Sequence, residues 1–464
     1  MIDQFTICAI STSPGMGAIA VIRLSGNEAI TITDRIFRSV VKTKKLLDQP
    51  ANSLHYGTLV DDQTLIDEVV VALFRSPHSY TGEDTIELSC HGSVYLQQTI
   101  LQLLLKNGAR LAKPGEFTQR AFLNGKLDLA QAEAVADVIS ASSASAHKVA
   151  LQQMRGGVSK EIKSLRNQLL TFTSLVELEL DFSEEDVEFA NRAELLKLSE
   201  DIQQLISKLA QSFQYGNALK NGIPIAIIGD ANVGKSTLLN VLLNEERAIV
   251  SEIAGTTRDV IEDILIIDGN QFRLIDTAGI RTTTDTIETL GIERTYEKIE
   301  QADVVLTLID ASRPFNEIVM FLTKMGEKLH QKKSALVINK IDIAEPEVVE
   351  ELIQMGKVMQ FPTLCIAARD KQNIDQLISF LIESVQNKAY SENDVIITNV
   401  RHFESLTNAG KAIDRVLEGL HSGISGDFLS QDIRECLYYL GEITGEISTD
   451  EVLGNIFKHF CIGK

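Results

Sequence analysis

The residues with the clearest chemical potential lie in the segment Gly229–Ser236, directly after the apolar run Ile225–Ile228. This segment fits the GxxxxGK(S/T) phosphate loop, which joins a buried strand to a helix. Its glycines allow backbone N–H groups to surround a polyphosphate, and the helix N-terminus adds a favourable dipole. Lys235 would reach the β- and γ-phosphates, while Ser236 would ligate Mg²⁺. For a lone match, the alternative is a glycine-rich turn that fits the pattern by chance.

Three further motifs follow, each at the end of a short apolar run. Asp276–Gly279 would supply a carboxylate that organises Mg²⁺. In Asn339–Asp342, the side chain of Asp342 could accept from both the ring N–H and the exocyclic amine of guanine. Adenine lacks that donor pair, so ATP would leave a buried carboxylate unpaired. Cys365–Ala368 would present a backbone N–H to the guanine carbonyl. Because ligands of open α/β sheets bind beyond the carboxyl ends of the strands, the four motifs predict a GTPase domain.

Composition limits the class of protein around these motifs. The 464 residues allow about three domains, and the net charge of −20 argues against a broad nucleic-acid footprint. If RNA is the substrate, a partner would supply many of the contacts that bind it. The five cysteines are scattered and lack CxxC spacing, which indicates reduced thiols. No apolar run reaches membrane-spanning length and no signal peptide is visible, so a soluble cytoplasmic protein is expected.

The elements that position the motifs follow from hydrophobic spacing. Residues 18–24 and 68–74 have the pattern of strands, whereas the pattern from 127 to about 215 is helical. A second helical segment, free of proline, follows the nucleotide motifs. We therefore expect a helical domain built from two segments, with the GTPase inserted between them. The predicted boundaries are 1–120 for a mixed α/β domain, 121–220 and 386–464 for the helical halves, and 221–385 for the GTPase.

Several other stretches carry a resemblance that extends over essentially the whole chain. They are Ser13–Gly17, Tyr80–Asp84, Pro114–Phe117, Arg120–Asp128 and the terminal Cys461–Lys464. Together with the nucleotide motifs and the helical flanks, they resemble the MnmE/TrmE family of tRNA modification GTPases. Gly255–Asp259 is shared more widely, with ribosome-assembly GTPases.

The resemblance implies a specific architecture and activity. The fold would combine a mixed α/β N-terminal domain that binds tetrahydrofolate and forms a homodimer, a discontinuous helical domain, and an inserted Ras-like GTPase domain that dimerises transiently. The family adds a carboxymethylaminomethyl or aminomethyl group at carbon 5 of the wobble uridine in tRNA. It works with a one-carbon tetrahydrofolate (5-formyl or methylene form) and a flavin-containing MnmG/GidA partner, in a heterotetramer or larger complex.

Hydrolysis needs an explanation beyond the Ras pattern, since Ile280 stands where Ras-like GTPases place a water-orienting glutamine. The resemblance implies that Glu288 orients water and that Thr257 joins Ser236 on Mg²⁺. It also implies a K⁺ ion, which would act electrostatically as an arginine finger does. The implied K⁺ ligands are Asn232, Ser251, Ile253 and Thr256. The alternatives are that Asn232 caps the next helix, and that Glu288 is an ordinary exposed residue; Arg258 has no assigned role.

With these additions, the predicted GTP-binding set can be stated in full. It comprises Asn232, Val233, Gly234, Lys235, Ser236, Thr237, Ser251, Thr256, Thr257, Asp276, Thr277, Ala278, Gly279, Asn339, Lys340, Asp342, Ala367, Ala368 and Arg369.

A second set follows from the resemblance alone. Arg23, Glu87, Lys126 and Lys464 would line the folate pocket, where a carboxylate suits the pterin edge and cations suit the glutamate tail. Cys461 would take part in the modification. The alternatives are surface ion pairs for the charged residues and an ordinary terminal thiol for Cys461. The adjacent pair Cys90-His91 is expected to be a core cysteine beside a hydrogen-bonded histidine, since two residues make a poor metal site.

Two functions of other classes compete with this prediction. One is a ribosome-assembly switch, which would need a basic RNA-binding appendage that the acidic flanks do not suggest. The other is a folate-binding dimerisation module with vestigial hydrolysis. Analysis of tRNA nucleosides would test the first, and turnover of GTP the second.

Overall fold

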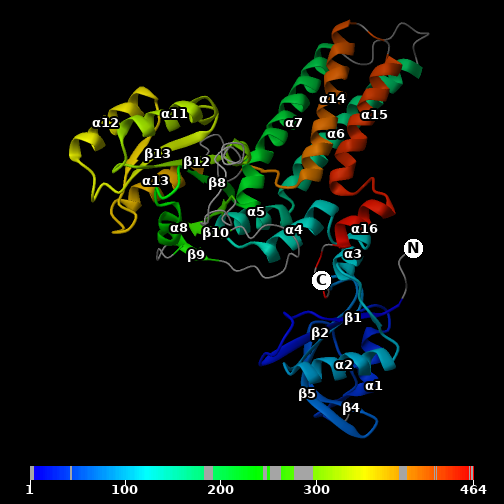
Figure 1. Ribbon diagram of the computed structural model, residues 1–464. Helices are drawn as coiled ribbons and strands as arrows, with labels where there is room; N and C mark the ends of the chain where they lie inside the picture. The colour runs from blue at the N-terminus through cyan, green and yellow to red at the C-terminus, as the bar shows by residue number, and fades with distance from the viewer. Residues whose placement is uncertain are drawn as a thin grey trace. The chain divides into compact units, whose positions relative to one another are not determined.

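The computed structural model describes residues 5–41, 44–181, 192–243, 248–250, 263–275, 296–385, 394–422, 424, 426–458, 460 and 463. Figure 1 shows the helices and strands of these residues, which form two compact units. The first unit comprises residues 1–139, 153–203 and 408–464, and the second comprises 140–152 and 204–407. The acidic segment 184–186 lies outside the described residues.

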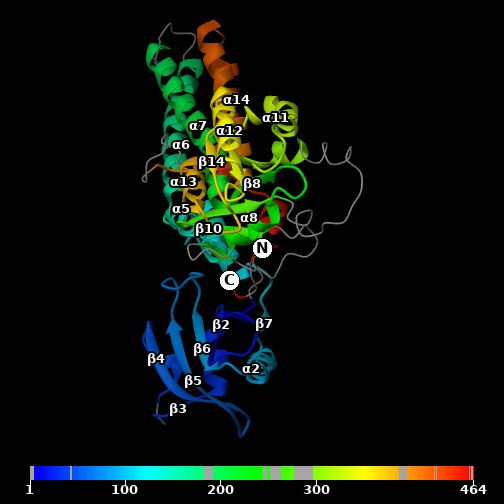
Figure 2. The same ribbon diagram turned by 60° about the vertical axis from the view of Figure 1, so that its left-hand side comes forward.

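The N-terminal part of the first unit is a mostly antiparallel sheet (Figure 2). Its strands are β1 (Ile7–Ile10), β2 (Ile19–Ser25), β3 (Phe37–Ser39), β4 (Ser53–Asp61), β5 (Thr64–Phe74), β6 (Thr85–His91) and β7 (Arg110–Leu111). They lie in the order β3-β4-β5-β6-β2-β1-β7, and β7 is parallel to β1. Strands β2 and β5 confirm the two strands expected near residues 18–24 and 68–74.

Both helices of this domain cover one face of the sheet. Helices α1 (Ala29–Ile36) and α2 (Val94–Lys106) share one buried cluster with apolar side chains from the strands. The strands show the matching alternation, as in β5, where buried residues alternate with exposed or half-buried ones. The opposite face therefore carries the more exposed set of side chains. A short 3₁₀ helix, η1 (Leu46–Asp48), precedes β4.

The rest of the first unit is helical and comes from both sides of the nucleotide motifs. Its elements are α3 (Glu116–Leu123), α4 (Leu129–Ser140), α6 (Gly157–Asp181), α15 (Gly426–Thr444) and α16 (Asp450–Lys458). Helix α15 packs along α6, far away in sequence, and Arg166 on α6 pairs with Glu446 just after α15 at 2.9 Å. This arrangement is the discontinuous helical domain that the two flanking segments predict.

The second unit has a mixed sheet in the order β14-β13-β12-β8-β11-β10-β9. The strands are β8 (Ile223–Ile228), β9 (Ala248–Val250), β10 (Asp263–Ile267), β11 (Asn270–Leu274), β12 (Val304–Asp310), β13 (Lys333–Asn339) and β14 (Thr363–Cys365). Among these described strands, β10 runs in the opposite direction to the other six. Central strands β8, β12 and β13 are mostly apolar and almost wholly buried because helices cover both of their faces.

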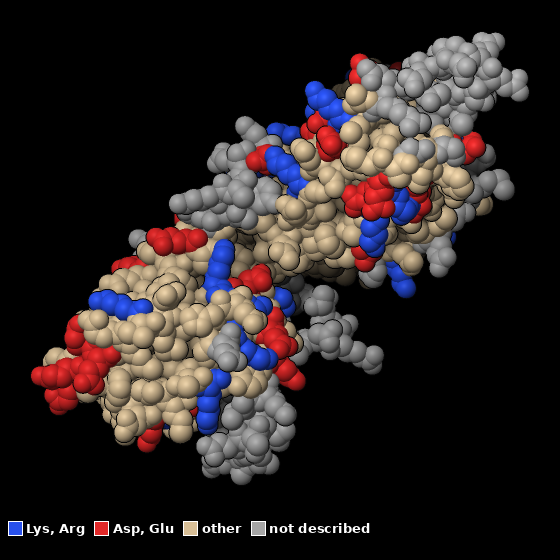
Figure 3. All heavy atoms as spheres, turned by 90° about the horizontal axis from the view of Figure 1, so that it is seen from above, with Lys and Arg blue, Asp and Glu red and all other residues tan. Residues whose placement is uncertain are grey.

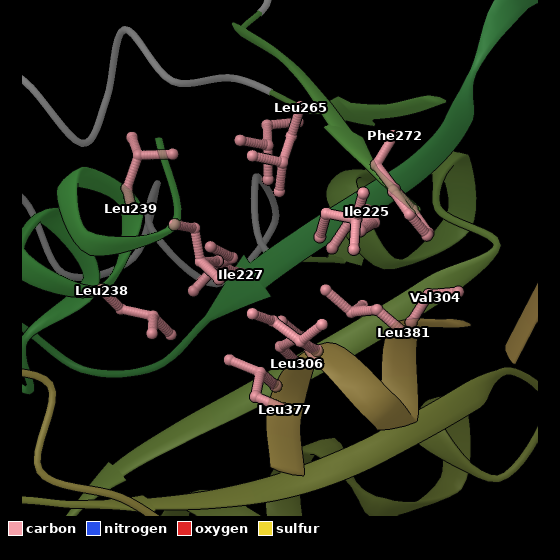
Figure 4. Packing of buried hydrophobic residues seen from close by; sticks show 14 of the residues in the cluster. Ile225, Ile227, Leu238, Leu239, Leu265, Phe272, Val304, Leu306, Leu377 and Leu381 are labelled. Carbon is pink, nitrogen blue, oxygen red and sulfur yellow. The ribbon is translucent and has the colours of Figure 1, made fainter. Parts of the chain in front are cut away.

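The covering helices fall into two groups. Helices α8 (Lys235–Leu243) and α13 (Ile374–Val385) pack on one face, where Leu238 and Leu377 belong to the cluster drawn in Figure 4. Helices α11 (Phe315–Leu329) and α12 (Pro346–Val358) share a separate cluster on the other face. The unit is thus a doubly wound α/β domain.

Three further helices connect the units or accompany the second one. Helix α5 (Ala144–Met154) belongs mainly to the second unit, while α7 (Arg192–Asn221) and α14 (Val400–Ser422) each run from one unit into the other. The units therefore divide inside helices, whereas sequence placed boundaries near 120, 220 and 385. Those domain boundaries stay predictions. Over the described part of the chain, no helix has the length and apolarity to cross a bilayer.

Candidate functional site

The phosphate loop lies at the switch point of the second sheet. Strand β8 has β12 on one side and β11 on the other. The chain that leaves β8 continues to strands on the β11 side, whereas the chain that leaves β12 continues to β13 on the other side. Such a point opens a crevice beyond the strands where ligands bind. The loop 229–234 fills this position and leads directly into α8, which begins at Lys235.

Side chains donate hydrogen bonds to the backbone carbonyls of the loop. Lys235 Nζ donates to the carbonyls of Gly229 and Asp230 at 2.7 and 2.6 Å. The next three carbonyls also accept from side chains: Ala231 from Arg313 Nη2, Asn232 from Lys340 Nζ at 3.0 Å, and Val233 from Asn339 Nδ2 at 2.8 Å. Since the C=O and N–H of a trans peptide point in opposite directions, these bonds turn the N–H groups away from the donors. The result is an array of backbone donors suited to an anion.

Two glycines are required by close approach. A Cβ at Gly229 would lie 2.2 Å from the carbonyl oxygen of Leu308, and one at Gly234 would lie 2.3 Å from Nδ2 of Asn339. Both residues also have positive φ, +151° and +102°. The spacing of glycines in the motif therefore has a steric cause in this fold.

The loops predicted to recognise guanine join the same network. Asn339 ends β13, and its Oδ1 accepts from the backbone N–H of Ala368 at 3.0 Å while its Nδ2 binds the phosphate loop. One side chain thereby links the phosphate loop, β13 and the loop after β14. Asp342 and Arg369 are exposed on these loops, and Ala367 and Ala368 are buried.

An ion pair anchors this assembly. Lys340 Nζ lies 2.6 Å from Oδ2 of Asp310, the last residue of β12. Burial alone would raise the pKa of the Asp310 carboxyl, but bonds from Lys340 and Ser312 outweigh burial and hold the pKa below its usual value. The pKa of Lys235 is lowered, first by burial and then by the nearby cation of Lys298. A bound polyphosphate would counteract the effect of Lys298, because its negative charge would raise the pKa of Lys235.

Part of the predicted nucleotide site lies outside the described residues. This part comprises Ser251, Ile253, Thr256, Thr257, Arg258, Asp276, Thr277, Ala278, Gly279, Ile280 and Glu288. Among the described residues, Ser236 and Thr237 lie exposed in the first turn of α8. Asn232 is exposed with φ +64°, which differs from the extended backbone of a helix N-cap.

A second cluster of polar groups lies on the N-terminal sheet. Arg23 on β2 faces Glu87 on β6 in register, with Nε donating to Oε1 at 2.8 Å. The guanidinium carbon of Arg23 lies 5.5 Å from the ring centre of Tyr80 and 5.7 Å from that of Phe117. The side chains of Arg23 and Glu87 are 16% and 29% exposed, so the pair is sheltered yet reachable.

The other predicted folate residues relate to this cluster in different ways. Lys126 Nζ donates to the carbonyl of Pro77 at 2.8 Å, in the same loop between β5 and β6 that carries Tyr80. The carbonyl of Gly463 accepts from Ser11 Oγ at 3.2 Å and from Arg23 Nη1 at 3.5 Å. Cys461 and Lys464, on either side of Gly463, are outside the described residues.

Cys90 and His91 have the structural roles expected from sequence. Cys90 is buried, and burial raises the pKa of its thiol to about 11. His91 Nδ1 lies 2.7 Å from Oδ1 of Asp67. The four described cysteines, Cys8, Cys90, Cys365 and Cys436, are free thiols.

Sequence reasoning assigned no role to three residues that the structure brings to these sites. Tyr80 and Phe117 lie in stretches that carry the family resemblance, which was their only signal. Arg313 lies outside every motif, and no pattern in the sequence pointed to it.

Comparisons with known proteins cover the whole chain. Residues 6–126 match the family model "GTP-binding protein TrmE N-terminus", and residues 129–461 match "MnmE helical domain". Three similar proteins are each named tRNA modification GTPase MnmE. The one from Bacteroides thetaiotaomicron is 56% identical, that from Bacteroides fragilis 55% and that from Flavobacterium johnsoniae 52%. Each alignment covers 100% of this chain and 100% of the relative.

Proposed function

The chain belongs to the MnmE/TrmE family, and we propose that it works as the GTPase subunit in modification of the wobble uridine of tRNA. It is a GTP-hydrolysing enzyme. The observation that carries this function is the phosphate loop, whose carbonyls from Gly229 to Val233 are all engaged by side chains. This arrangement leaves the amide groups available to a polyphosphate, and Asn339 links the loop to the proposed guanine site.

Lys235, Ser236 and the loop amides would hold the triphosphate and its Mg²⁺. Mg²⁺ would neutralise charge on the phosphate oxygens, with Thr257 and Asp276–Gly279 completing that side of the site. Asn232, Ser251, Ile253 and Thr256 would hold K⁺, which would offset the charge that develops on the phosphates. The exposed, left-handed Asn232 on the rim of the loop supports this assignment. Glu288 would orient the attacking water.

The Arg23–Glu87 pair supports the proposal of a folate site. A pterin offers a flat ring and a guanidine-like edge, and the cluster offers two aromatic rings beside a cation and a carboxylate. Bound tetrahydrofolate would supply the one-carbon unit. Glu87 would take the pterin edge, while Arg23, Lys126 and Lys464 would take carboxylates. Cys461 would lie near this site through the docking of Gly463 on Ser11 and Arg23.

Exposed apolar side chains on strands β4 and β5 of the N-terminal sheet support a homodimer. Strand register places Leu54, Tyr56 and Val70 on the same face as Arg23 and Glu87, opposite α1 and α2. Leu54 and Tyr56 are 72% and 54% exposed. Adjacent apolar side chains at this exposure are typical of a contact surface. A second copy would cover them and shelter both folate sites.

The remaining partners would be tRNA and a flavin protein of the MnmG/GidA type, in a heterotetramer or larger complex in the cytoplasm. On the face drawn in Figure 3, the basic side chains are interspersed with acidic ones. That distribution is compatible with a chain that binds tRNA together with a partner.

The nucleotide function is tested by hydrolysis of GTP and ATP by the full chain. We expect turnover with GTP and essentially none with ATP, with higher rates in K⁺ than in Na⁺. Asp342→Asn should reduce GTP affinity roughly 100-fold, since it replaces a charged double acceptor. Xanthosine triphosphate, which has a carbonyl in place of the exocyclic amine, should regain part of the affinity in that variant. Equal use of GTP and ATP by the unaltered chain would contradict the proposal.

The tRNA function needs its own experiment. The full chain, the flavin partner, GTP and methylene-tetrahydrofolate would be incubated with unmodified tRNA, followed by mass spectrometry of the nucleosides. We expect a new substituent on the wobble uridine that depends on GTP and on the chain. If GTP is hydrolysed while the uridine stays unchanged in the complete mixture, the assignment to tRNA modification fails.

A further inference from the structure

One side chain that holds the phosphate loop belongs to none of the four nucleotide motifs. Arg313 lies between β12 and α11, and its guanidinium bridges two neighbouring loop residues. Nη2 donates to the carbonyl of Ala231, and Nη1 lies 3.3 Å from Oδ2 of Asp230. The carbonyls of Gly229, Asp230, Asn232 and Val233 accept from side chains of motif residues, namely Lys235, Lys340 and Asn339.

The turn that presents Arg313 is itself anchored. Asp310, which is 4% exposed, accepts from the N–H and the hydroxyl of Ser312 at 3.0 and 2.6 Å. The N–H of Arg313 donates to the carbonyl of Asp310 at 3.1 Å, and Pro314 follows with its restricted φ. Asp310 is also the partner of Lys340. The guanidinium thus extends from a backbone that is already tied to the guanine-recognition loop.

Peptide geometry gives the contact to Ala231 a consequence for the ligand. Because the peptide unit is planar and trans, a hold on the Ala231 oxygen fixes the direction of the Asn232 N–H. Lys340 fixes the next peptide in the same way, through the oxygen of Asn232. Asn232 has φ +64°, a left-handed conformation that is unfavourable for a side chain with a Cβ. Arg313 and Lys340 therefore hold both peptides that flank a strained residue.

The contact to Asp230 has a separate, electrostatic consequence. Asp230 is the second residue of the phosphate loop, and its side chain is 46% exposed. A bare carboxylate there would repel a triphosphate bound by the same loop. The guanidinium of Arg313 offsets this charge through Nη1. Because the group is planar and has two terminal nitrogens, Nη2 can donate to the Ala231 oxygen at the same time. A lysine at this position would keep the positive charge near Asp230, but its single ammonium could not also reach the Ala231 oxygen in the same geometry.

We propose that Arg313 is a positioning residue for GTP, which orients the Asn232 amide toward the phosphates and neutralises Asp230. This inference rests on the proposed GTPase function and deepens it. These two roles predict two defects that can be measured separately. Loss of the positive charge beside Asp230 should weaken GTP binding, and loss of the hydrogen bond to Ala231 should slow hydrolysis at saturating GTP.

Four variants of the full chain separate these roles by GTP affinity and kcat. In Arg313→Ala, we expect affinity to fall about 10- to 50-fold and kcat about tenfold. In Arg313→Lys, affinity should stay within about threefold while kcat falls about fivefold. In the double variant Arg313→Ala with Asp230→Asn, affinity should recover but kcat should not. Lys328→Ala, which removes an exposed ion pair with Glu300 in the same unit, is the matched control and should behave as the unaltered chain.

The outcomes distinguish this inference from the proposed function. If the unaltered chain neither binds nor hydrolyses GTP, both are overturned. If it hydrolyses GTP and both Arg313 variants match it within twofold, the role of Arg313 is overturned while the GTPase stands. Equal losses in Lys328→Ala would also overturn the role. Should thermal unfolding show that Arg313→Ala is destabilised, Arg313→Lys decides: a reduced kcat at unchanged affinity supports the role, and unaltered kinetics overturn it.

Discussion

The phosphate loop and the Arg23–Glu87 cluster prepare for their ligands in opposite ways. In the loop, side chains from distant segments engage the backbone carbonyls, so the main chain presents the binding groups. In the N-terminal sheet, the main chain is used in strand pairing, and the register of β2 and β6 places a cation beside a carboxylate. A site formed by main-chain groups is sensitive to a Cβ added at its glycines and to loss of the side chains that bind its carbonyls. A side-chain site depends on the few groups that touch the ligand.

The largest effect is expected from Lys235→Ala. The change removes a cation from the phosphates and two bonds that shape the loop. GTP hydrolysis should fall about 10³-fold, measured as phosphate release, while binding of a reduced folate stays unchanged. A parallel loss of folate binding would show that the two sites are not independent.

Gly234→Ala tests the main-chain site without altering any functional group. The new Cβ would stand 2.3 Å from Nδ2 of Asn339, at a φ of +102°. We expect Asn339 to be displaced from Val233 and GTP affinity to fall about 10- to 100-fold. Gly454→Ala is a suitable control, since a Cβ there meets no atom within 4 Å and φ is not in the left-handed range. Normal affinity in Gly234→Ala would contradict the account of the loop.

Glu87→Gln tests the side-chain site and should have a smaller effect. The amide preserves shape but loses the charge that would bind the pterin edge. Affinity for 5-formyl-tetrahydrofolate, measured by calorimetry, should fall about tenfold, with GTP hydrolysis unchanged. The same change at Glu28, which is exposed just before α1, provides the control. Equal folate affinities in the two variants would remove Glu87 from the site.

The smallest effect concerns stability in acid. Asp310 has a lowered pKa in the folded chain because bonds from Lys340 and Ser312 outweigh its burial. Its contribution to stability is therefore present above the unfolded value of about 3.9 and is lost as pH falls through the folded value. Asp310→Asn should lower the free energy of unfolding of the GTPase unit by about 1–3 kcal/mol at pH 7.

Urea unfolding of the full chain between pH 3 and 7 checks this sign. The difference between Asp310→Asn and the unaltered chain should shrink below about pH 4. Glu116 in the N-terminal domain also has a lowered pKa. Burial disfavours its charged form, but hydrogen bonds from Arg110 and Lys113 outweigh burial. The unaltered chain should therefore lose stability in both regions over the same acidic range. A difference that grows toward pH 3 would contradict the assignment for Asp310.

Much of the nucleotide site could be predicted from sequence because it is built from contiguous motifs. Lys235 and Asn339 occur at fixed offsets in short segments that follow apolar strands, and the doubly wound sheet brings the ends of those strands together. The proposed folate residues could be named only through the family resemblance, since Arg23 and Glu87 are 64 residues apart. Their pairing depends on the register between β2 and β6, which the local pattern does not encode.

By itself, the sequence determined two strands of the N-terminal sheet, the strands that precede the nucleotide motifs, the phosphate loop and the presence of helical segments on both sides of the GTPase. These features follow from local chemistry: apolar runs, glycine positions and the spacing of polar groups. Only the tertiary structure decided that Arg313 holds Ala231, that Tyr80 and Phe117 flank Arg23, and that the compact units divide within α7 and α14. Such contacts join segments far apart in the chain, and their geometry is set by the packing of whole elements rather than by neighbouring residues.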